Sequence, residues 1–222
     1  MNSAVEILDD ATPSRYLGIK RIFDFGIASF AILMLGGLMI AIAIGIRLSS
    51  PGPIFYRQKR IGKDGKPFDM LKFRSMQVQN NPDLHKQYVQ KLIRENTSPS
   101  ALGKDSLKII GDPRITGLNK YLRKFSLDEL PQFFNVLKGE MSVVGPRPSL
   151  PYELEVYQEW HKQRLNILPG ITGLWQVTAR NTVAFDEMVR IDLEYMQSMN
   201  LWLDLKIIFL TPIEMIVGRG AG

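Results

Sequence analysis

A run of 22 residues without a charged side chain, from Phe25 to Ile46, constrains this chain more than any other feature of its sequence. As an α-helix the run would be about 33 Å long, close to the thickness of the hydrocarbon core of a bilayer. A secretory signal has a shorter apolar stretch, and no small-residue cleavage motif follows this one. Apolar runs in buried core helices are usually shorter too. We therefore expect a membrane protein.

Gly36 and Gly37 lie almost at the centre of the run and leave two arrangements open. Glycines weaken a helix and permit a bend, which here would give two arms of about 15 Å, each half a bilayer long. The segment would then enter and leave the membrane on the same face. A straight span, in which the glycines only allow close helix packing, fits the sequence equally well.

Basic residues flank the run on both sides. Lys20 and Arg21 come just before it, and Arg47 begins a group of six cations that extends to Lys66. Basic segments prefer the cytoplasmic side of a membrane. We therefore expect most of the chain on the cytoplasmic face of the cell's inner membrane.

The net charge and the composition give only broad limits on the binding partners and on the type of metal. The formal net charge is +6 and the sequence pI is about 9.5, which suits lipid head groups, nucleotides or nucleic acid without choosing between them. The chain has no cysteine and only two histidines, which excludes disulfides and argues against zinc. A metal would be a hard cation such as Mg²⁺, held by carboxylates and phosphates.

A β-hairpin follows the membrane segment. Residues 53–58 and 68–76 have strand patterns and are joined through an Asp-Gly turn at 64–65. In the second strand Lys72 and Arg74 share one face. They either line an anion site or form an ordinary solvated face, and the pattern slightly favours the solvated face. Four helices are predicted further along the chain, over 83–95, 152–164, 183–199 and 201–217. The last of them is predicted to be a core or interfacial helix.

The segment from Arg123 to Gly139 is the richest in residues suited to phosphate chemistry. Its apolar residues have helical spacing, and either a Ser126–Glu129 capping box or an Asp128 cap would place Asp128 and Glu129 at the helix N-terminus. There an ionised aspartate is suited to attack phosphorus, and a glutamate to hold a divalent cation. Taken in isolation, acidic residues in a first turn are more often ordinary caps.

Two arginines strengthen the catalytic interpretation of the Asp128–Glu129 dyad. Arg123 lies just before it, and Arg147 lies between two prolines in a loop with little freedom. The planar fork of an arginine binds phosphate through two N–H groups. Neither a Walker loop nor a GxGxxG pattern is present.

Six motifs occur in a characteristic order between about Lys20 and Thr211, which is most of the chain: KRIFD (20–24), SPGPIFYRQKRIG (50–62), FDMLKFRSM (68–76), DPRIT (112–116), LRKFSLDELPQFFNVLKGEMSVVGPRP (122–148) and PGITGLWQV (169–177). Together they resemble the bacterial sugar transferase family, the monotopic phosphoglycosyl transferases of exopolysaccharide, O-antigen and glycoprotein pathways. The length and order of the motifs make this resemblance very specific.

The resemblance implies a two-step mechanism. Asp128 would attack the β-phosphate of a UDP-sugar, release UMP and carry the sugar-phosphate covalently. Polyprenyl phosphate, usually undecaprenyl phosphate, would then accept it to give a polyprenyl diphosphosugar. Glu129 matches the family's Mg²⁺-binding glutamate. Four further residues match substrate-binding positions: Arg123, Arg147, Lys72 and Asp192.

The expected fold is α+β. It consists of a polar N-terminal segment (1–19), a membrane helix (20–48) and a catalytic domain (49–222) with the hairpin, mainly helices, and interfacial helices. The resemblance implies a re-entrant membrane helix, commonly broken by a Ser-Pro pair, whereas Gly36-Gly37 in this chain forces no kink. The expected partners are the UDP-sugar, the polyprenyl phosphate lipid and the membrane, without nucleic acid, and a homodimer is compatible with the sequence.

Two other functions are compatible with the same residues. A membrane phosphohydrolase would use Asp128 in the same way but pass the phosphoryl group to water. A basic membrane adaptor would bind anionic lipids or nucleic acid without turnover, and neutralising Asp128 would not affect it. The six motifs favour the transferase.

Overall fold

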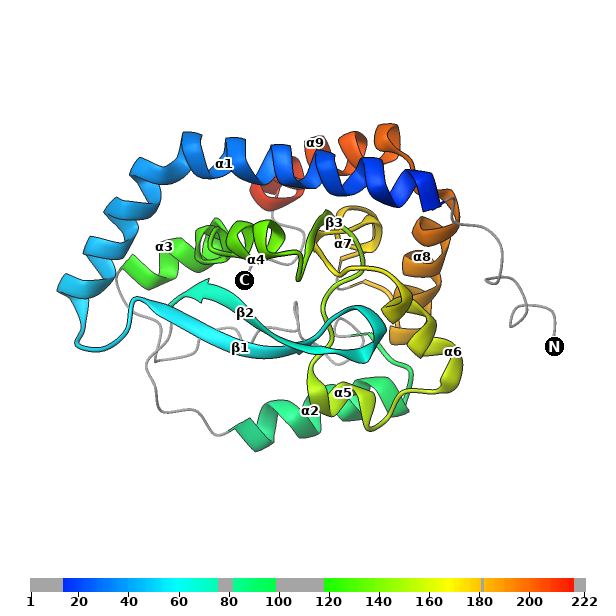
Figure 1. Cartoon of the computed structure of the whole chain (residues 1–222). Coiled ribbons are helices and arrows are strands. Elements are labelled where there is room, and N and C mark those ends of the chain that lie inside the picture. The colour runs from blue at the N-terminus through cyan, green and yellow to red at the C-terminus, as the bar shows by residue number, and fades with distance from the viewer. Residues whose placement is uncertain (1–13, 76–81, 99–117, 181, 218–222) are drawn as a thin grey trace.

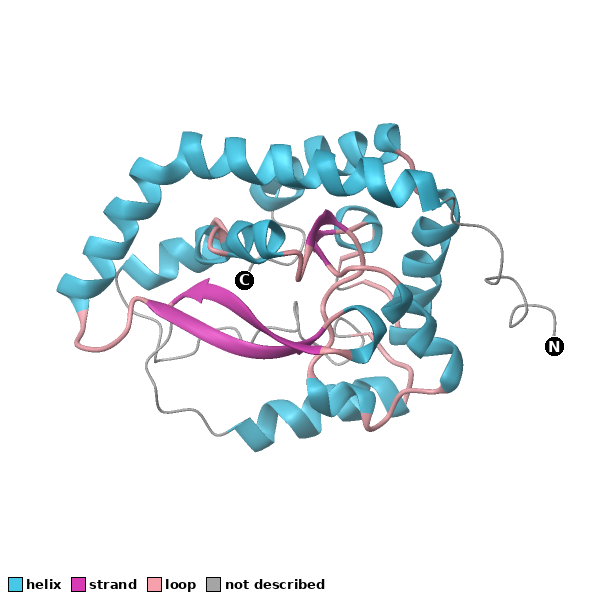
Figure 2. Ribbon diagram, in the orientation of Figure 1, coloured by secondary structure: helices cyan, strands magenta, loops and turns pink. Residues whose placement is uncertain are grey.

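The computed structural model describes residues 14–75, 82–98, 118–180 and 182–217. The DPRIT motif at 112–116 and most of the polar N-terminal segment lie outside these residues. Helices and two small sheets make up the described chain, which confirms the predicted α+β class (Figure 2). The elements are α1 (Ser14–Ser49), β1 (Phe55–Ile61), η1 (Lys63–Gly65), β2 (Pro67–Phe73), α2 (Pro82–Arg94), α3 (Leu118–Lys124), η3 (Leu127–Glu129), α4 (Gln132–Lys138), β3 (Ser142–Val144), α5 (Pro151–Leu154), α6 (Glu159–Lys162), η4 (Gln163–Asn166), β4 (Gly170–Thr172), α7 (Leu174–Thr178), α8 (Phe185–Ser198) and α9 (Leu201–Val217).

The N-terminal helix α1 continues without interruption for 36 residues, which confirms the predicted long apolar helix. Its axis changes direction part-way along, so that one arm lies across the top of the molecule and the other descends along its side (Figure 1). By length and composition it could cross a membrane, since an 18-residue stretch of it has a mean hydropathy of 2.6. At Gly36 and Gly37 an added Cβ would meet no atom within 4 Å, so packing within the described chain does not require these glycines.

Both arms of α1 pack against the same body. In the N-terminal arm Ala28 is fully buried in the main apolar core, which also contains Val143 of β3 and Ile207 of α9. In the C-terminal arm Ile46 is buried in a second apolar core, together with Phe73 of β2. The two ends of the apolar helix are therefore fixed to one domain.

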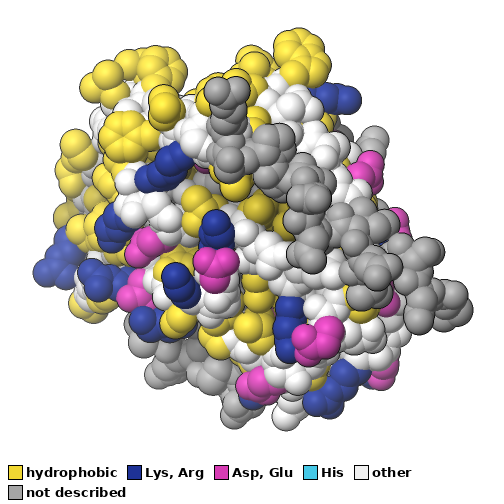
Figure 3. Space-filling view, turned by 45° about the vertical axis from the view of Figure 1, so that its right-hand side comes forward, with side chains coloured by type: hydrophobic (Ala, Val, Ile, Leu, Met, Phe, Trp, Pro, Cys, Tyr) yellow, Lys and Arg dark blue, Asp and Glu magenta, His cyan; other side chains and the backbone are white. Residues whose placement is uncertain are grey.

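The outward faces of α1 and α9 are apolar. Ile22, Leu33 and Leu48 of α1 and Trp202 and Phe209 of α9 are each more than 70% exposed, with values of 76, 74, 82, 78 and 72%. α9 lies beside the N-terminal arm of α1 (Figure 1), and hydrophobic side chains gather along the upper rim of the molecule (Figure 3). Contiguous exposed apolar surface of this kind suits a lipid environment.

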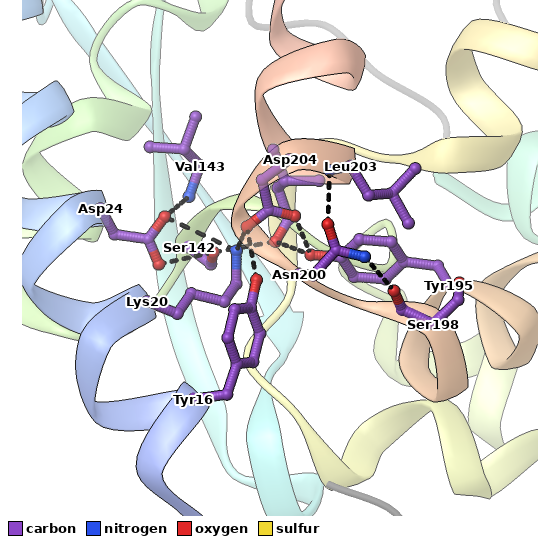
Figure 4. A network of polar contacts seen from close by, with 11 residues as sticks. Tyr16, Lys20, Asp24, Ser142, Val143, Tyr195, Ser198, Asn200, Leu203 and Asp204 are labelled. Atoms are coloured by element: carbon purple, nitrogen blue, oxygen red, sulfur yellow. Dashed lines mark hydrogen bonds and ion pairs between the residues drawn. The ribbon is translucent and has the colours of Figure 1, made fainter. Parts of the chain in front are cut away.

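A buried polar network joins the N-terminal arm of α1 to β3 and α9 (Figure 4). Lys20 forms an ion pair with Asp204 at 2.5 Å and lies 3.8 Å from Asp24. The Tyr195 hydroxyl donates to Asp204 at 2.7 Å, and the Ser142 hydroxyl donates to Asp24 at 2.7 Å. Because a buried charge without its partner costs several kcal/mol, these bonds specify where the arm lies.

The predicted hairpin is present as β1 and β2, which pair antiparallel with Phe55 opposite Phe73. Its turn contains the short helix η1, where Asp64 and Gly65 have positive φ angles of 57° and 72°. Such angles are the reason for an Asp-Gly sequence at this position. β3 and β4 form a second, parallel pair that the sequence patterns did not predict.

Two helix predictions need correction, whereas those at 83–95, 183–199 and 201–217 correspond to α2, α8 and α9. The helix predicted over 152–164 is divided into α5, α6 and η4. Neither Ser126 nor Asp128 caps α4, because Ser126 is left-handed (φ 50°) without a capping bond and α4 begins only at Gln132. The dyad instead occupies the 3₁₀ turn η3. With seven residues, α4 is also too short for a helix-dipole argument about the dyad.

We expect Asp204→Asn to lower the free energy of unfolding by about 3 kcal/mol, because it removes the closest counter-charge of the buried Lys20 ammonium. The midpoint of thermal unfolding in detergent micelles measures the loss. As a control, Lys59→Gln breaks the exposed pair with Asp69 and should cost less than about 1 kcal/mol. Equal shifts in the two variants would contradict a special role for the buried network.

Candidate active site

The Asp128–Glu129 dyad lies next to the second strand of the hairpin. The Ser75 hydroxyl, just beyond β2, donates to Asp128 Oδ2 at 3.2 Å, and Lys72 Nζ lies 2.9 Å from Glu129 Oε1. Asp128 is buried, whereas the Glu129 side chain is 26% exposed. Strand and turn thus bring a lysine, a hydroxyl and two carboxylates together, and Lys72 is not part of a solvated face.

Apolar side chains hold the dyad against the apolar helix α1. Leu127 and Leu130, on either side of the dyad, pack against the second apolar core, to which α1 contributes Met39, Ile42 and Ile46. The dyad therefore lies beside the C-terminal arm of α1. Ionisable side chains are thereby placed next to the segment that is apolar enough to enter a bilayer.

Arg74 ties the loop after α1 to the same strand. Its buried guanidinium donates to the carbonyl oxygens of Ser50 and Pro51 at 2.7 and 2.8 Å. Gly52 has a φ of +122°, and a Cβ added there would overlap the Arg74 guanidinium, so only glycine fits. Because Arg74 immediately precedes Ser75, this contact connects the end of α1 to the residue that bonds the aspartate of the dyad.

Two polar side chains hold α4 between the hairpin and α1. Asn135 is fully buried, accepts a bond from the Leu71 N–H at 2.9 Å and donates to the Asp69 carbonyl at 2.8 Å. Arg21 of α1 donates to the carbonyl oxygens of residues 136 and 137, at 2.6 and 3.1 Å. Carbonyl oxygens at a helix C-terminus have no partner within the helix. This explains why an arginine of α1 is useful there.

The loop Gly145–Ser149, which carries Arg147, is bonded to the rest of the domain at every residue. Five hydrogen bonds do this: Gly145 N–H to the Thr172 carbonyl (2.9 Å), Gly170 N–H to the Pro146 carbonyl (2.8 Å), the Arg164 guanidinium to the Arg147 carbonyl (3.2 Å), the Arg60 guanidinium to the Pro148 carbonyl (2.8 Å) and Ile61 N–H to the Ser149 carbonyl (2.8 Å). The backbone that presents Arg147 is therefore fixed without a ligand.

Arg60 connects this loop electrostatically to the dyad. Burial and the nearby charge of Arg147 lower the pKa of Arg60 to about 10, and Glu153 and Glu129 act against this lowering. One buried guanidinium therefore lies within range of both Arg147 and Glu129. A diphosphate site requires cations of this kind near the reacting carboxylate.

The other two predicted residues, Arg123 and Asp192, are on α3 and α8. Arg123 is on α3, which packs beside η3, and its side chain is partly exposed. Asp192 is on α8, is 1% exposed and forms an ion pair with Arg164 at 2.5 Å. Burial raises the pKa of Asp192 to about 6 against the attraction of Arg164. Asp192 is therefore buried, and its partner Arg164 bonds the backbone carbonyl of Arg147.

Comparison with known proteins identifies the family. The sequence model of bacterial sugar transferases matches residues 15–218. The chain belongs to the bacterial sugar transferase family. The resemblance found in the six motifs is thereby confirmed.

Three similar proteins illustrate the match. Galactosyl transferase CpsE of Streptococcus agalactiae is 41% identical over 207 residues, covering 93% of this chain and 44% of that protein. Exopolysaccharide production protein ExoY of Rhizobium meliloti is 39% identical over 202 residues, covering 91% and 87%. UDP-glucose:undecaprenyl-phosphate glucose-1-phosphate transferase of Escherichia coli is 37% identical over 211 residues, covering 91% and 41%. The chain thus spans less than half of the first and third relatives.

Glu129 is one described residue of this family member that is suited to share a metal with a substrate. Within the described ranges no three histidine, aspartate or glutamate side chains converge. Mg²⁺ commonly takes one or two protein carboxylates and completes its shell with phosphate oxygens and water. The partly exposed Glu129 beside Asp128 fits a cation that binds together with a phosphorylated substrate.

Sequence reasoning missed two residues of the candidate site, Ser75 and Arg60. The hairpin register pairs Tyr56 with Lys72, and directly paired residues share a face. Strand alternation then places Arg60 on the face of Lys72, so this signal was available in the sequence. For Ser75 there was no local signal, because its partner Asp128 is 53 residues away.

We expect Gly52→Ala to reduce sugar-transfer activity about tenfold or more, because the added methyl displaces the Arg74 guanidinium that anchors the strand before Ser75. Gly65→Ala is the matched control, since Gly65 also has a positive φ (+72°) but open space around it. It should cost only about 1–2 kcal/mol of backbone strain. If both variants lose activity equally at matched thermal stability, the link between Arg74 and the site is refuted.

Proposed function

We propose that the chain transfers a sugar-1-phosphate from a UDP-sugar to a polyprenyl phosphate, usually undecaprenyl phosphate, as the first membrane step of glycoconjugate synthesis. The observation that carries this proposal is the dyad, bonded to Lys72 and Ser75 and held beside the apolar helix α1. The names of the relatives support it, because one is a UDP-glucose:undecaprenyl-phosphate glucose-1-phosphate transferase. Their sugars differ, so glucose and galactose are both reasonable donors to test.

The first half-reaction is a displacement at phosphorus. An Asp128 carboxylate oxygen forms a bond to the β-phosphorus, the bond from that phosphorus to the bridging oxygen breaks, and UMP leaves with the electron pair. Asp128 then carries the sugar-phosphate as a covalent acyl phosphate. The hydrogen bond from Ser75 holds one carboxylate oxygen in place for the attack.

The second half-reaction returns the enzyme to its starting state. A phosphate oxygen of the polyprenyl phosphate attacks the same phosphorus, the bond to Asp128 breaks, and polyprenyl diphosphosugar leaves. Splitting one displacement into two steps lets a water-soluble donor and a membrane-bound acceptor use the same carboxylate in turn. The position of the dyad beside α1 brings that carboxylate to the lipid.

Cationic groups stabilise the negative charge on the diphosphate. Arg147 on its fixed loop, Lys72 beside Glu129 and Arg123 on the adjacent helix would bind phosphate oxygens. Mg²⁺ held through Glu129 would supply further neutralisation of these oxygens. Desolvation near the membrane strengthens each of these attractions.

We further propose that α1 is re-entrant and that the catalytic domain lies on the cytoplasmic face of the inner membrane. A straight span would carry one end of α1 away from the domain, yet Lys20 near one end and Ile46 near the other are both buried against it. The apolar outer faces of α1 and α9 would then lie in the same lipid leaflet.

Asp128→Asn should abolish UMP release, by about a thousandfold or more, because an amide cannot act as the nucleophile. The measurement is UMP formed from a panel of UDP-sugars with Mg²⁺, first without lipid acceptor, where wild type should release one equivalent, and then with polyprenyl phosphate. Asp69→Asn, an exposed carboxylate on the hairpin, is the matched control and should behave like wild type.

Two results would overturn the proposal. Undiminished UMP release from the Asp128→Asn variant would remove the aspartate from the mechanism. A sugar phosphate released into water, with no diphosphate-linked lipid formed when the acceptor is present, would instead indicate a phosphohydrolase.

A further inference from the structure

Glu153 of α5 is a buried carboxylate whose position is determined from several sides. Its Oε1 lies 3.2 Å from Arg147 Nη1, while its Oε2 accepts bonds from the Leu150 N–H at 3.0 Å and the Tyr157 hydroxyl at 3.3 Å. The side chain is 2% exposed. Burial alone would raise the pKa of Glu153, but Arg147 and Arg60 outweigh burial and hold it below its usual value. The carboxylate is therefore charged and held in place.

Around Glu153 the cluster contains more positive than negative groups. Three arginines, Arg60, Arg147 and Arg164, lie with two carboxylates, Glu153 and Asp192. Arg164 is paired with Asp192 at 2.5 Å and both are 1% exposed, and Arg60 is 6% exposed. Only Arg147 of the three has substantial access to solvent, at 21%. The unbalanced positive charge is thus available to a ligand at Arg147.

The contact with Glu153 uses one side of the Arg147 guanidinium. Within the described part of the chain, Nη1 is the only nitrogen of Arg147's side chain that bonds to protein. A guanidinium has five N–H donors in a planar fork, so the edge turned away from Glu153 remains able to bind two oxygens of one phosphate. A fixed carboxylate on one edge therefore determines where the other edge points.

We propose that Glu153 is a positioning residue, which aims the Arg147 guanidinium at a phosphate of the nucleotide-sugar donor. This rests on the proposed function for the identity of the donor, but the geometry requires only a phosphate-bearing ligand. Asp192 acts one step further back, since it holds Arg164, and Arg164 holds the carbonyl oxygen of Arg147 at 3.2 Å. The predicted substrate-binding role of Asp192 becomes, in this account, support for the loop.

The test is a double-mutant cycle on UDP binding and on UMP release, using Glu153→Gln, Arg147→Met and the double variant. Glu153→Gln keeps the shape of the side chain and removes the charge. It should weaken UDP binding and raise KM for the donor about tenfold, with a smaller change in kcat. In the Arg147→Met background the same substitution should have almost no further effect, because Glu153 acts through Arg147.

The Glu153→Asp variant tests whether Glu153 orients the Arg147 guanidinium or only supplies a negative charge near it. It keeps the negative charge but withdraws the carboxylate by one methylene, so positioning predicts a loss close to that of Glu153→Gln, whereas simple charge balance predicts wild-type binding. Additive losses in the cycle, or wild-type UDP binding by Glu153→Asp with a normal unfolding midpoint, would overturn the proposal. Failure of the proposed function would appear differently, as UDP binding by wild type without UMP release from any UDP-sugar.

Discussion

The attachment of both arms of α1 to one domain is the constraint on which the rest of the structure depends. At the N-terminal arm the attachment is polar, through the buried pair of Lys20 and Asp204. At the C-terminal arm it is apolar, through Ile46 and its neighbours. Apolar packing alone tolerates slippage, whereas a buried ion pair is satisfied in only one arrangement. The combination places an apolar helix at a defined position over a polar site.

The chemistry follows from that placement. Leu127 and Leu130 pack against the second apolar core, to which the C-terminal arm contributes, so the turn between them holds Asp128 and Glu129 beside that arm. Behind the dyad, buried side chains hold the backbone elements that surround it, as Asn135 does for α4. Glu129 and Arg147 are partly exposed, whereas Arg60 and Arg164 behind them are buried and bonded to backbone carbonyl oxygens of the loop that carries Arg147. This division between a rigid support and a few exposed ligands is how a site is organised before its substrate arrives.

The sequence predicted the elements whose signals are local. The apolar run gave α1, alternation and an Asp-Gly pair gave the hairpin, and helical periodicity gave α2, α8 and α9. The start of α4 was wrong, because Ser126 adopts a left-handed conformation that composition does not reveal. Ser75 was missed and the burial of Asp192 was not anticipated, since both depend on residues distant in the chain. The dyad itself was chosen partly from a capping pattern that the structure does not contain, so its catalytic role stays a prediction that depends on the family resemblance.

The most direct test of the central claim asks on which side of the membrane the two ends of α1 lie. Because the chain has no cysteine, the single substitutions Ser3→Cys, Ser49→Cys and Leu33→Cys can each be labelled with a membrane-impermeant thiol reagent, in intact cells and in inside-out vesicles. Attachment of both arms to one cytoplasmic domain predicts that Ser3→Cys and Ser49→Cys are labelled only in the vesicles, and Leu33→Cys in neither. Labelling of Ser3→Cys in intact cells, with Ser49→Cys labelled only in vesicles, would show a full span and contradict the account.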